Sequence, residues 1–157
     1  MTRIRAARAG DLPIICDFNA RMAVETEGLE LDRDRLTSGV RRVLDDPGRG
    51  RYFLADDGDR VVAQTMITYE WSDWRDAWFW WIQSVYVHPD CRGAGRFRML
   101  LEHIEKLAAE QGDVCGIRLY VDSGNHAAAR VYDRLGFAAS CYRMREKDLT
   151  IARSALC

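Results

Sequence analysis

The fold is decided by residues 78–98, which read WFWWIQSVYVHPDCRGAGRFR. The first ten residues of this stretch are rich in aromatic and β-branched side chains, as strands are. Two glycines follow at positions 93 and 95, and apolar residues recur at helical spacing from Phe97 onward. The stretch therefore predicts a strand, a glycine-rich turn and a helix in direct succession.

The segments on either side predict a mixed sheet covered by helices. The helix over 97–110 has the clearest apolar stripe, formed by Phe97, Leu100, Leu101, Ile104, Leu107 and Ala108. The other predicted elements are a strand at 3–7, helices at 12–24 and 31–44 with an acidic connection at 25–28, strands at 52–55, 61–70 and 117–121, a helix at 125–135 and a last strand at 137–147. In this order, a group of strands comes first and is followed by strand, helix, strand, helix and strand. Such an order favours an α/β or α+β fold with a mixed sheet.

Composition and charge exclude several classes of protein. The chain has 157 residues, 48% of them hydrophobic, which predicts a single domain over 1–157. Its 23 Lys and Arg balance 24 Asp and Glu, so no global charge favours nucleic acid or an anionic membrane. The longest purely apolar run, 77–82, is far below the roughly 18 residues of a membrane span. No targeting signal is apparent at the start of the chain.

The five cysteines are odd in number and widely spaced, at Cys16, Cys91, Cys115, Cys141 and Cys157. No C-x-x-C pair or other spacing of metal ligands occurs, so no metal site is predicted. Reduced thiols favour the cytoplasm. Cys91 is interpreted as a small packing residue, with a nucleophile as the alternative.

The glycine-rich turn has the chemistry of a phosphate-binding loop. Glycines allow close approach of backbone N–H groups, an open helix N-terminus carries partial positive charge, and arginines add bidentate contacts. The turn matches neither G-x-x-x-x-G-K-[ST] nor G-x-G-x-x-G, so a nucleoside triphosphatase is not predicted. Glycines required only for the sharp turn are the structural alternative.

A wider pattern surrounds this turn. Val85-Tyr86-Val87-His88-Pro89-x-x-Arg92-Gly93-x-Gly95 is followed by the helix, a strand, and then Asn125-x-x-Ala128-x-x-Val131-Tyr132-x-x-Leu135-Gly136-Phe137. Together these residues resemble the GNAT superfamily of acetyl-CoA-dependent N-acetyltransferases. The resemblance extends over about 78–137 and implies a mostly antiparallel central sheet with two splayed strands flanked by helices.

The resemblance also implies a site for acetyl-CoA. The pyrophosphate would lie in a backbone cradle formed by Arg92, Gly93, Ala94, Gly95, Arg96, Phe97 and Arg98. The pantetheine arm would pair with Val85, Tyr86 and Val87 as an added strand, and Asn125 would lie near the sulfur. Family members have glycine or alanine where this chain has Phe97. Because Phe97 opens the apolar stripe of its helix, we expect its ring to point inward.

The implied reaction is direct attack of an amine on the thioester, which requires two proton transfers. A neutral tyrosine can protonate the departing sulfur, and the position of Tyr132 in the motif indicates it as the general acid, with inward packing as the alternative. The base is less clear among Glu70, Asp73, Asp76 and His88. Glu70 is the chosen candidate, acting directly or through water, against the alternative of a solvated carboxylate. Val85 N–H is the candidate for polarising the thioester carbonyl.

All five tryptophans fall within residues 71–81. Their faces, with Glu70, Asp73 and Asp76 nearby and Glu25 and Glu27 as further acids, would suit a cationic amine on a small molecule or peptide. The alternative is cross-strand packing and a homodimer contact. The predicted function is therefore an N-acetyltransferase, against a non-catalytic acyl-CoA sensor or a Trp-rich dimerisation module on the same fold.

Overall fold

A computed structural model describes residues 2–147 and 149 of the chain. The described residues form two compact units, one reaching to Tyr120 and the other starting at Val121. The first unit contains the sheet and the second contains a single helix. Each unit is described by itself below.

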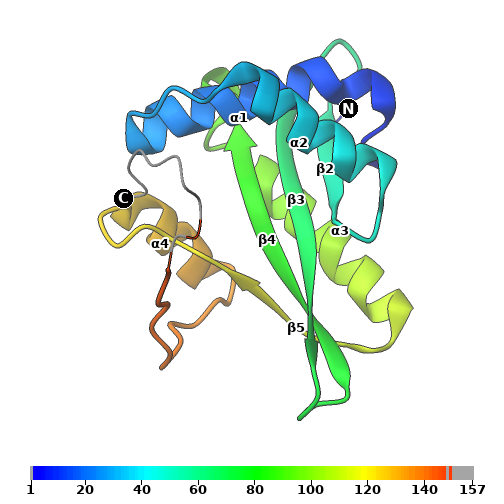
Figure 1. Ribbon diagram of the computed structural model, residues 1–157, viewed down its shortest axis with the longest axis vertical. Helices are drawn as coiled ribbons and strands as arrows, with labels where there is room; N and C mark the ends of the chain where they lie inside the picture. Colours follow the sequence, from blue (N-terminus) through cyan, green and yellow to red (C-terminus); the bar gives the residue numbers. More distant parts are fainter. Residues whose placement is uncertain (1, 148, 150–157) are drawn as a thin grey trace. The chain divides into compact units, whose positions relative to one another are not determined.

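The first unit is built on one five-stranded sheet in the order β1-β2-β3-β4-β5. Its strands are β1 (Arg3–Ala6), β2 (Arg51–Asp56), β3 (Val61–Ser72), β4 (Ala77–Val87) and β5 (Val114–Leu119). Neighbouring strands are antiparallel except β4 and β5, which are parallel. The predicted mixed, mostly antiparallel sheet is confirmed. β3 and β4 are its longest strands, and their hairpin extends beyond the rest of the sheet (Figure 1).

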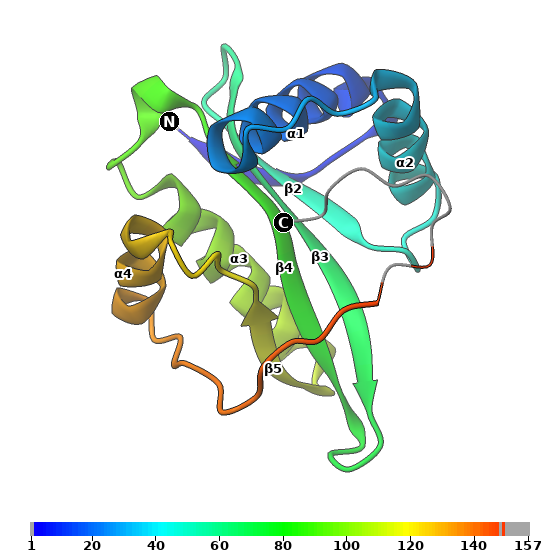
Figure 2. The same cartoon turned by 60° about the vertical axis from the view of Figure 1, so that its left-hand side comes forward.

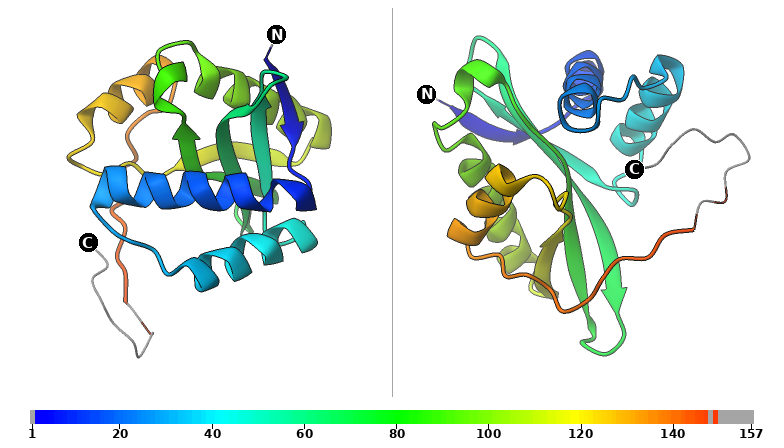
Figure 3. Two further views of the ribbon diagram at one scale, coloured as in Figure 1. Left: turned by 90° about the horizontal axis from the view of Figure 1, so that it is seen from above. Right: turned by 90° about the vertical axis from the view of Figure 1, so that its left-hand side faces the viewer.

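Three helices cover this sheet on both faces. Helices α1 (Leu12–Glu27) and α2 (Arg33–Asp45) lie side by side on one face, and α3 (Arg96–Gln111) lies on the other (Figure 3). The predicted acidic connection at 25–28 is wrong. Glu25 to Glu27 are helical, and Gly28 ends α1 because its left-handed backbone (φ 66°) is the usual conformation of a C-terminal cap. No helix among the described residues is long and apolar enough to cross a membrane.

The apolar core lies on both faces of the sheet. On the α1–α2 face, Ile15 and Leu54 are fully buried and pack with Val40 and Tyr52. On the other face, α3 buries the predicted stripe of Phe97, Leu100, Leu101 and Ile104. The apolar stripe expected from the 3.6-residue period of α3 is therefore buried, and it packs the helix against the strands that precede the glycine turn.

The second unit contains α4 (His126–Arg134). Asn125 is its N-terminal cap, with Oδ1 accepting a hydrogen bond from Ala128 N–H at 3.0 Å. Gly136 follows the helix with a left-handed backbone (φ 88°), as predicted for a C-terminal cap. The rings of Tyr132 and Phe137 meet edge to face with centroids 5.9 Å apart.

The predicted strand at 137–147 is wrong, since these residues contain no strand. A strand here would need apolar residues that are buried on one side. Tyr142 and Met144 are instead 77% and 63% exposed, so the apolar burial that favours a strand is missing here. Arg143, Arg145 and Glu146, between and after them, are exposed as well.

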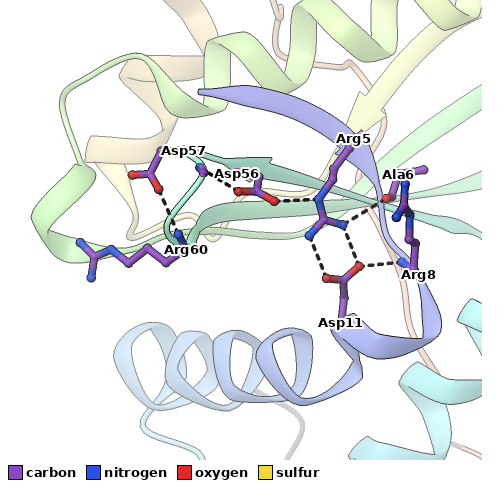
Figure 4. A network of polar contacts seen from close by, with 8 residues as sticks. Arg5, Ala6, Arg8, Asp11, Asp56, Asp57 and Arg60 are labelled. Atoms are coloured by element: carbon purple, nitrogen blue, oxygen red, sulfur yellow. Dashed lines mark hydrogen bonds and ion pairs between the residues drawn. The ribbon is translucent and has the colours of Figure 1, made fainter. Parts of the chain in front are cut away.

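A partly buried ion cluster joins β1 to β2 and to Asp11, which precedes α1 (Figure 4). The Arg5 guanidinium donates to both carboxylate oxygens of Asp11 at 2.8 and 2.9 Å, and to Asp56 at 2.8 Å. Asp11 also accepts the Arg8 N–H at 2.7 Å. All three charged side chains are at most 21% exposed. The hydrogen bonds from Arg5 hold the pKa values of Asp11 and Asp56 below their usual range.

We expect Arg5→Gln to lower the free energy of unfolding by about 1–3 kcal/mol at pH 7, because Asp11 loses a bidentate partner and Asp56 loses a charge-assisted hydrogen bond. Carboxylates with lowered pKa values stabilise the fold above their usual pKa of 3.8, and this contribution is lost as pH falls through the lowered values. The difference in free energy of unfolding between Arg5→Gln and wild type should therefore narrow near pH 3. Denaturant unfolding at both pH values measures it, with exposed Arg41→Gln as control. An equal loss at pH 7 and pH 3 would contradict the prediction.

Candidate functional site

The glycine turn connects β4 to α3 through a short 3₁₀ turn, η2 (Pro89–Cys91). Residues 92–95 are exposed, and Gly93 and Gly95 both have left-handed backbones, with φ values of 75° and 71°. A Cβ atom built on either glycine would meet nothing within 4 Å, so the space beside the turn is open. The first backbone hydrogen bond of α3 runs from Met99 N–H to the Gly95 carbonyl. The amides of Gly93, Ala94 and Gly95 precede this hydrogen bond and lie outside the helix.

The three predicted phosphate-binding arginines differ in what their side chains contact. Arg98 pairs with Glu102 one turn along the helix at 2.9 Å. Arg96 donates to the Thr2 hydroxyl, and its Nε is buried without a partner among the described residues. Arg92 stays at the turn, where Nε donates to the Val87 carbonyl at 3.0 Å and Nη2 to Glu25. Of the three guanidinium groups, only that of Arg92 is held at the turn itself.

Glu25 is the acid at the end of α1 that holds this arginine. It accepts hydrogen bonds from Arg92 and, at 2.9 Å, from the Tyr86 hydroxyl. The Arg92 contact is the main cause of a lowered pKa at Glu25, while burial and the carboxylate raise the pKa of Tyr86. The Arg92 guanidinium also lies over the Tyr86 ring, 5.7 Å from its centroid. Sequence reasoning placed Glu25 near the acceptor, whereas its contacts are to two predicted cofactor-binding residues.

Strand β4 is irregular just before the turn. Gln64 pairs with Tyr86 but Met66 pairs with Gln83, so Ser84 and Val85 together face the single residue Thr65 in a β-bulge. Ser84 has a left-handed backbone (φ 52°), which is uncommon outside glycine. The bulge bends β4 and takes Val85 out of regular pairing with β3.

The edge of β4 that pairs with β5 becomes unpaired just before the bulge. Its pairing with β5 covers residues from Trp78 to Ile82 and ends at the Ile82–Leu119 pair. β5 ends there, whereas β4 continues to Val87 (Figure 2). Within the described part of the first unit, no strand pairs with Val85, Tyr86 and Val87 on this side. An unpaired strand edge can accept an extended ligand as an added strand.

Glu70, the predicted base, lies on β3 opposite Phe79 of β4. Phe79 precedes Val85 by six residues in the sequence. Six residues of strand span about 20 Å. Its carboxylate accepts from Trp81 Nε1 and, at 3.1 and 3.3 Å, from Arg118. The other candidate bases are dispersed: Asp73 and Asp76 lie in the β3–β4 turn, and His88 begins η2. The role of Glu70 remains a prediction, and over this distance it requires a chain of several waters to carry the proton.

Tyr132 and Asn125 belong to the second unit. Tyr132 is half-buried on α4, and burial raises the pKa of its hydroxyl above the usual value of 10.0. A tyrosine hydroxyl is protonated at neutral pH with or without this rise, as a proton donor must be. The side-chain oxygen of Asn125 caps α4. Their roles beside the sulfur remain predictions.

The tryptophans divide into three environments. Trp80 is 1% exposed in the core, and Trp71 forms an edge-to-face pair with cross-strand Trp78 at 5.0 Å, which is the packing interpretation. Trp81 stacks on Tyr120, with centroids 4.4 Å apart, beside Glu70. Trp74, in the hairpin turn, is 91% exposed. Only Trp81 is combined with an acid as the functional interpretation requires.

A buried polar cluster beneath the bulge was missed by sequence reasoning. Asn19 on α1 and Gln64 on β3 are 5% and 0% exposed, and Gln64 Nε2 donates to Asn19 Oδ1 at 2.7 Å. A signal was available, because both interrupt segments whose periodicity predicts burial. A polar residue at a buried position normally has a specific hydrogen-bonding partner.

Comparison with known proteins gives one family match. The family model described as "Acetyltransferase (GNAT) family" matches residues 16–137. The chain is also similar to a solved structure described as a possible acetyltransferase from Clostridium difficile 630. The two share 43% sequence identity with a TM-score of 0.89, over 96% of this chain and 99% of that one.

A second solved structure is similar in fold. It is described as a "predicted acetyltransferase with acetyl-CoA" from Clostridium acetobutylicum, with 19% identity and a TM-score of 0.76, over 94% of this chain and 96% of that one. At this identity the likeness concerns the fold alone. No functionally curated protein matches the chain.

Proposed function

Since the chain belongs to the GNAT family of acetyltransferases, whose cosubstrate is acetyl-CoA, we propose that it transfers the acetyl group to a primary amine. The observation that carries this proposal is the continuous arrangement of bulge, free strand edge and glycine turn. The edge of β4 is unpaired beyond Ile82, and the turn that follows exposes left-handed glycines before α3. This geometry fits an elongated ligand with a phosphorylated end.

In this proposal the chain's own residues bind and orient the two reactants. Backbone amides of residues 93–98 and the Arg92 guanidinium hold the pyrophosphate, and the edge of Val85 to Val87 holds the pantetheine arm. The Val85 N–H hydrogen-bonds to the thioester carbonyl, where negative charge develops. Asn125 would lie beside the sulfur, as the family motif implies. Acetyl-CoA supplies the activated acyl group, and orientation against the amine supplies much of the rate.

Two protons must move for the reaction to balance. The attacking amine loses one, which we assign to Glu70 through a chain of several waters, because about 20 Å of strand separates Glu70 from Val85. The departing sulfur gains one, which we assign to the Tyr132 hydroxyl. The place of Tyr132 in the motif from Asn125 to Phe137 supports the second assignment, and a tyrosine hydroxyl is protonated at neutral pH and can donate its proton. The products are the acetylated amine and free CoA thiol.

The acceptor is proposed to be cationic before it reacts. Trp81 and Tyr120 present stacked aromatic rings beside the Glu70 carboxylate, a combination that attracts ammonium groups. Arg118 partly neutralises Glu70 and lies 3.5 Å over the Phe79 ring. Acceptors with an anionic group near the amine would find a partner in Arg118, so amino acids and small peptides belong in the screen.

Three broader features complete the proposal. The second unit, with Tyr132, would act with the first as one catalytic domain. A cytoplasmic location is supported by the unpaired thiols of all four cysteines in the described residues; Cys157 lies outside them. A homodimer is supported by Trp71 and Trp74, which are 47% and 91% exposed at the hairpin end.

Isothermal calorimetry with acetyl-CoA, CoA and ATP, followed by thiol release with a panel of amines, tests the proposal. We expect saturable binding of both CoA species, no binding of ATP, and weaker binding by Arg92→Ala. Thiol release should depend on the amine. Binding without transfer to any amine would favour the acyl-CoA sensor, and absence of CoA binding would overturn both functions.

A further inference from the structure

A small polar cluster lies against the bulge of β4, and we define it as Asn19, Tyr52, Gln64 and Ser84. The first three are at most 5% exposed, on the face of the sheet that α1 covers. A buried polar group that lacks a hydrogen bond destabilises a protein by about 1–3 kcal/mol. The members of the cluster therefore constrain one another's positions.

Hydrogen bonds connect the cluster from α1 to the bulge. Gln64 Nε2 donates to Asn19 Oδ1 at 2.7 Å and reaches the Ser84 carbonyl at 3.4 Å. Asn19 Nδ2 donates to the Tyr52 hydroxyl at 3.1 Å. Burial raises the pKa of Tyr52, and hydrogen bonds with Asn19 and Ser84 oppose that rise. Gln64 is thus the link between the helix and the backbone of the bulge.

The bulge needs such support because its backbone is strained. A left-handed residue other than glycine costs about 1–2 kcal/mol, and Ser84 has this conformation. Two buried side chains of β3 donate to carbonyls at this point: Gln64 to Ser84, and Thr65 to Gln83 at 3.2 Å. Loss of either donor would allow the backbone to relax toward a regular strand.

We propose that Gln64 is a positioning residue, which fixes the bulge at Ser84 and Val85 through the Ser84 carbonyl. Asn19 accepts from the Gln64 amide nitrogen, and its own hydrogen bond to the Tyr52 hydroxyl holds Asn19 in place. The direction of the Val85 N–H then depends on Gln64. This inference rests on the proposed function, in which that N–H faces the thioester carbonyl. A displacement of about 1 Å at such a group can lower a rate 100-fold.

The test replaces Gln64 with methionine, which has similar length and no hydrogen-bonding nitrogen. We expect kcat to fall 10- to 100-fold, while KM for acetyl-CoA changes less than about threefold because the amides at 93–98 are unaffected. Tyr52→Phe, which leaves both Gln64 bonds in place, should lower kcat only two- to fivefold. Gln111→Met, at the exposed end of α3, is the matched control and should equal wild type.

A second readout does not depend on activity. Backbone chemical shifts of Ser84 report its φ angle, and in Gln64→Met they should move away from left-handed values without any cosubstrate present. Unchanged shifts, or a wild-type kcat at equal folded fraction, would overturn the inference. If Gln64→Met does not fold, a Tyr52→Phe variant with wild-type kcat and shifts would overturn it. If wild type transfers no acetyl group, the proposed function fails, and the shifts alone decide whether Gln64 holds the bulge.

Discussion

The Tyr132→Phe variant is expected to turn over about 10²- to 10³-fold more slowly than wild type, with nearly unchanged affinity for acetyl-CoA. The proposed role of the hydroxyl is to protonate the departing sulfur, and general acid catalysis contributes roughly this much to a rate. Phenylalanine preserves the ring, including its edge-to-face contact with Phe137. Single-turnover kinetics with calorimetry of cosubstrate binding separate the loss of rate from any loss of binding.

The pH dependence gives this prediction a second signature. Burial places the pKa of Tyr132 above 10.0, so the protonated, active form persists at neutral pH and disappears only as pH rises through the raised value. Wild-type kcat should therefore decline on the alkaline side, and the variant should lack that decline. Tyr142→Phe, a tyrosine that is 77% exposed, is the control. Equal rates for wild type and Tyr132→Phe would remove Tyr132 from the mechanism.

Gly95→Ala should weaken acetyl-CoA binding by about 10- to 100-fold, the equivalent of about 1.4–2.8 kcal/mol. Gly95 has a left-handed backbone (φ 71°) and begins α3, with open space where a Cβ would stand. In the proposed function the pyrophosphate occupies this space against the backbone amides. A methyl group there would push the phosphate away from the donors that bind it.

The matched control is Gly112→Ala at the other end of α3. Gly112 also has a left-handed backbone (φ 85°) and open space around its Cβ position, so both variants have a similar backbone strain of about 1–2 kcal/mol. Thermal unfolding should therefore shift equally in the two proteins, and calorimetry should distinguish them. Equal acetyl-CoA affinities in both variants would show that the glycine turn is not the phosphate site.

Local patterns were enough to predict most of the first unit. The apolar stripe of α3 and the strands before it depend on side-chain periodicity, which neighbouring residues determine. The inward-pointing ring of Phe97 followed from its place in that stripe, and it is 8% exposed. The same reasoning failed at 137–147, because an apolar alternation indicates a strand only where one side is covered. Gly28 was misread because a glycine after acids suits a loop and a helix cap equally.

The sequence by itself determined the order of strands and helices in the first unit, the glycine turn before α3 and the membership of the family. Only the tertiary structure decided what those residues contact. Arg92 meets Glu25 across 67 positions of sequence, and Gln64 meets Asn19 across 45. The bulge at Ser84, the end of the β4–β5 pairing at Ile82 and the distribution of the tryptophans depend likewise on strand register. Such contacts depend on how distant segments pack, and no local periodicity encodes which polar side chain will meet which partner.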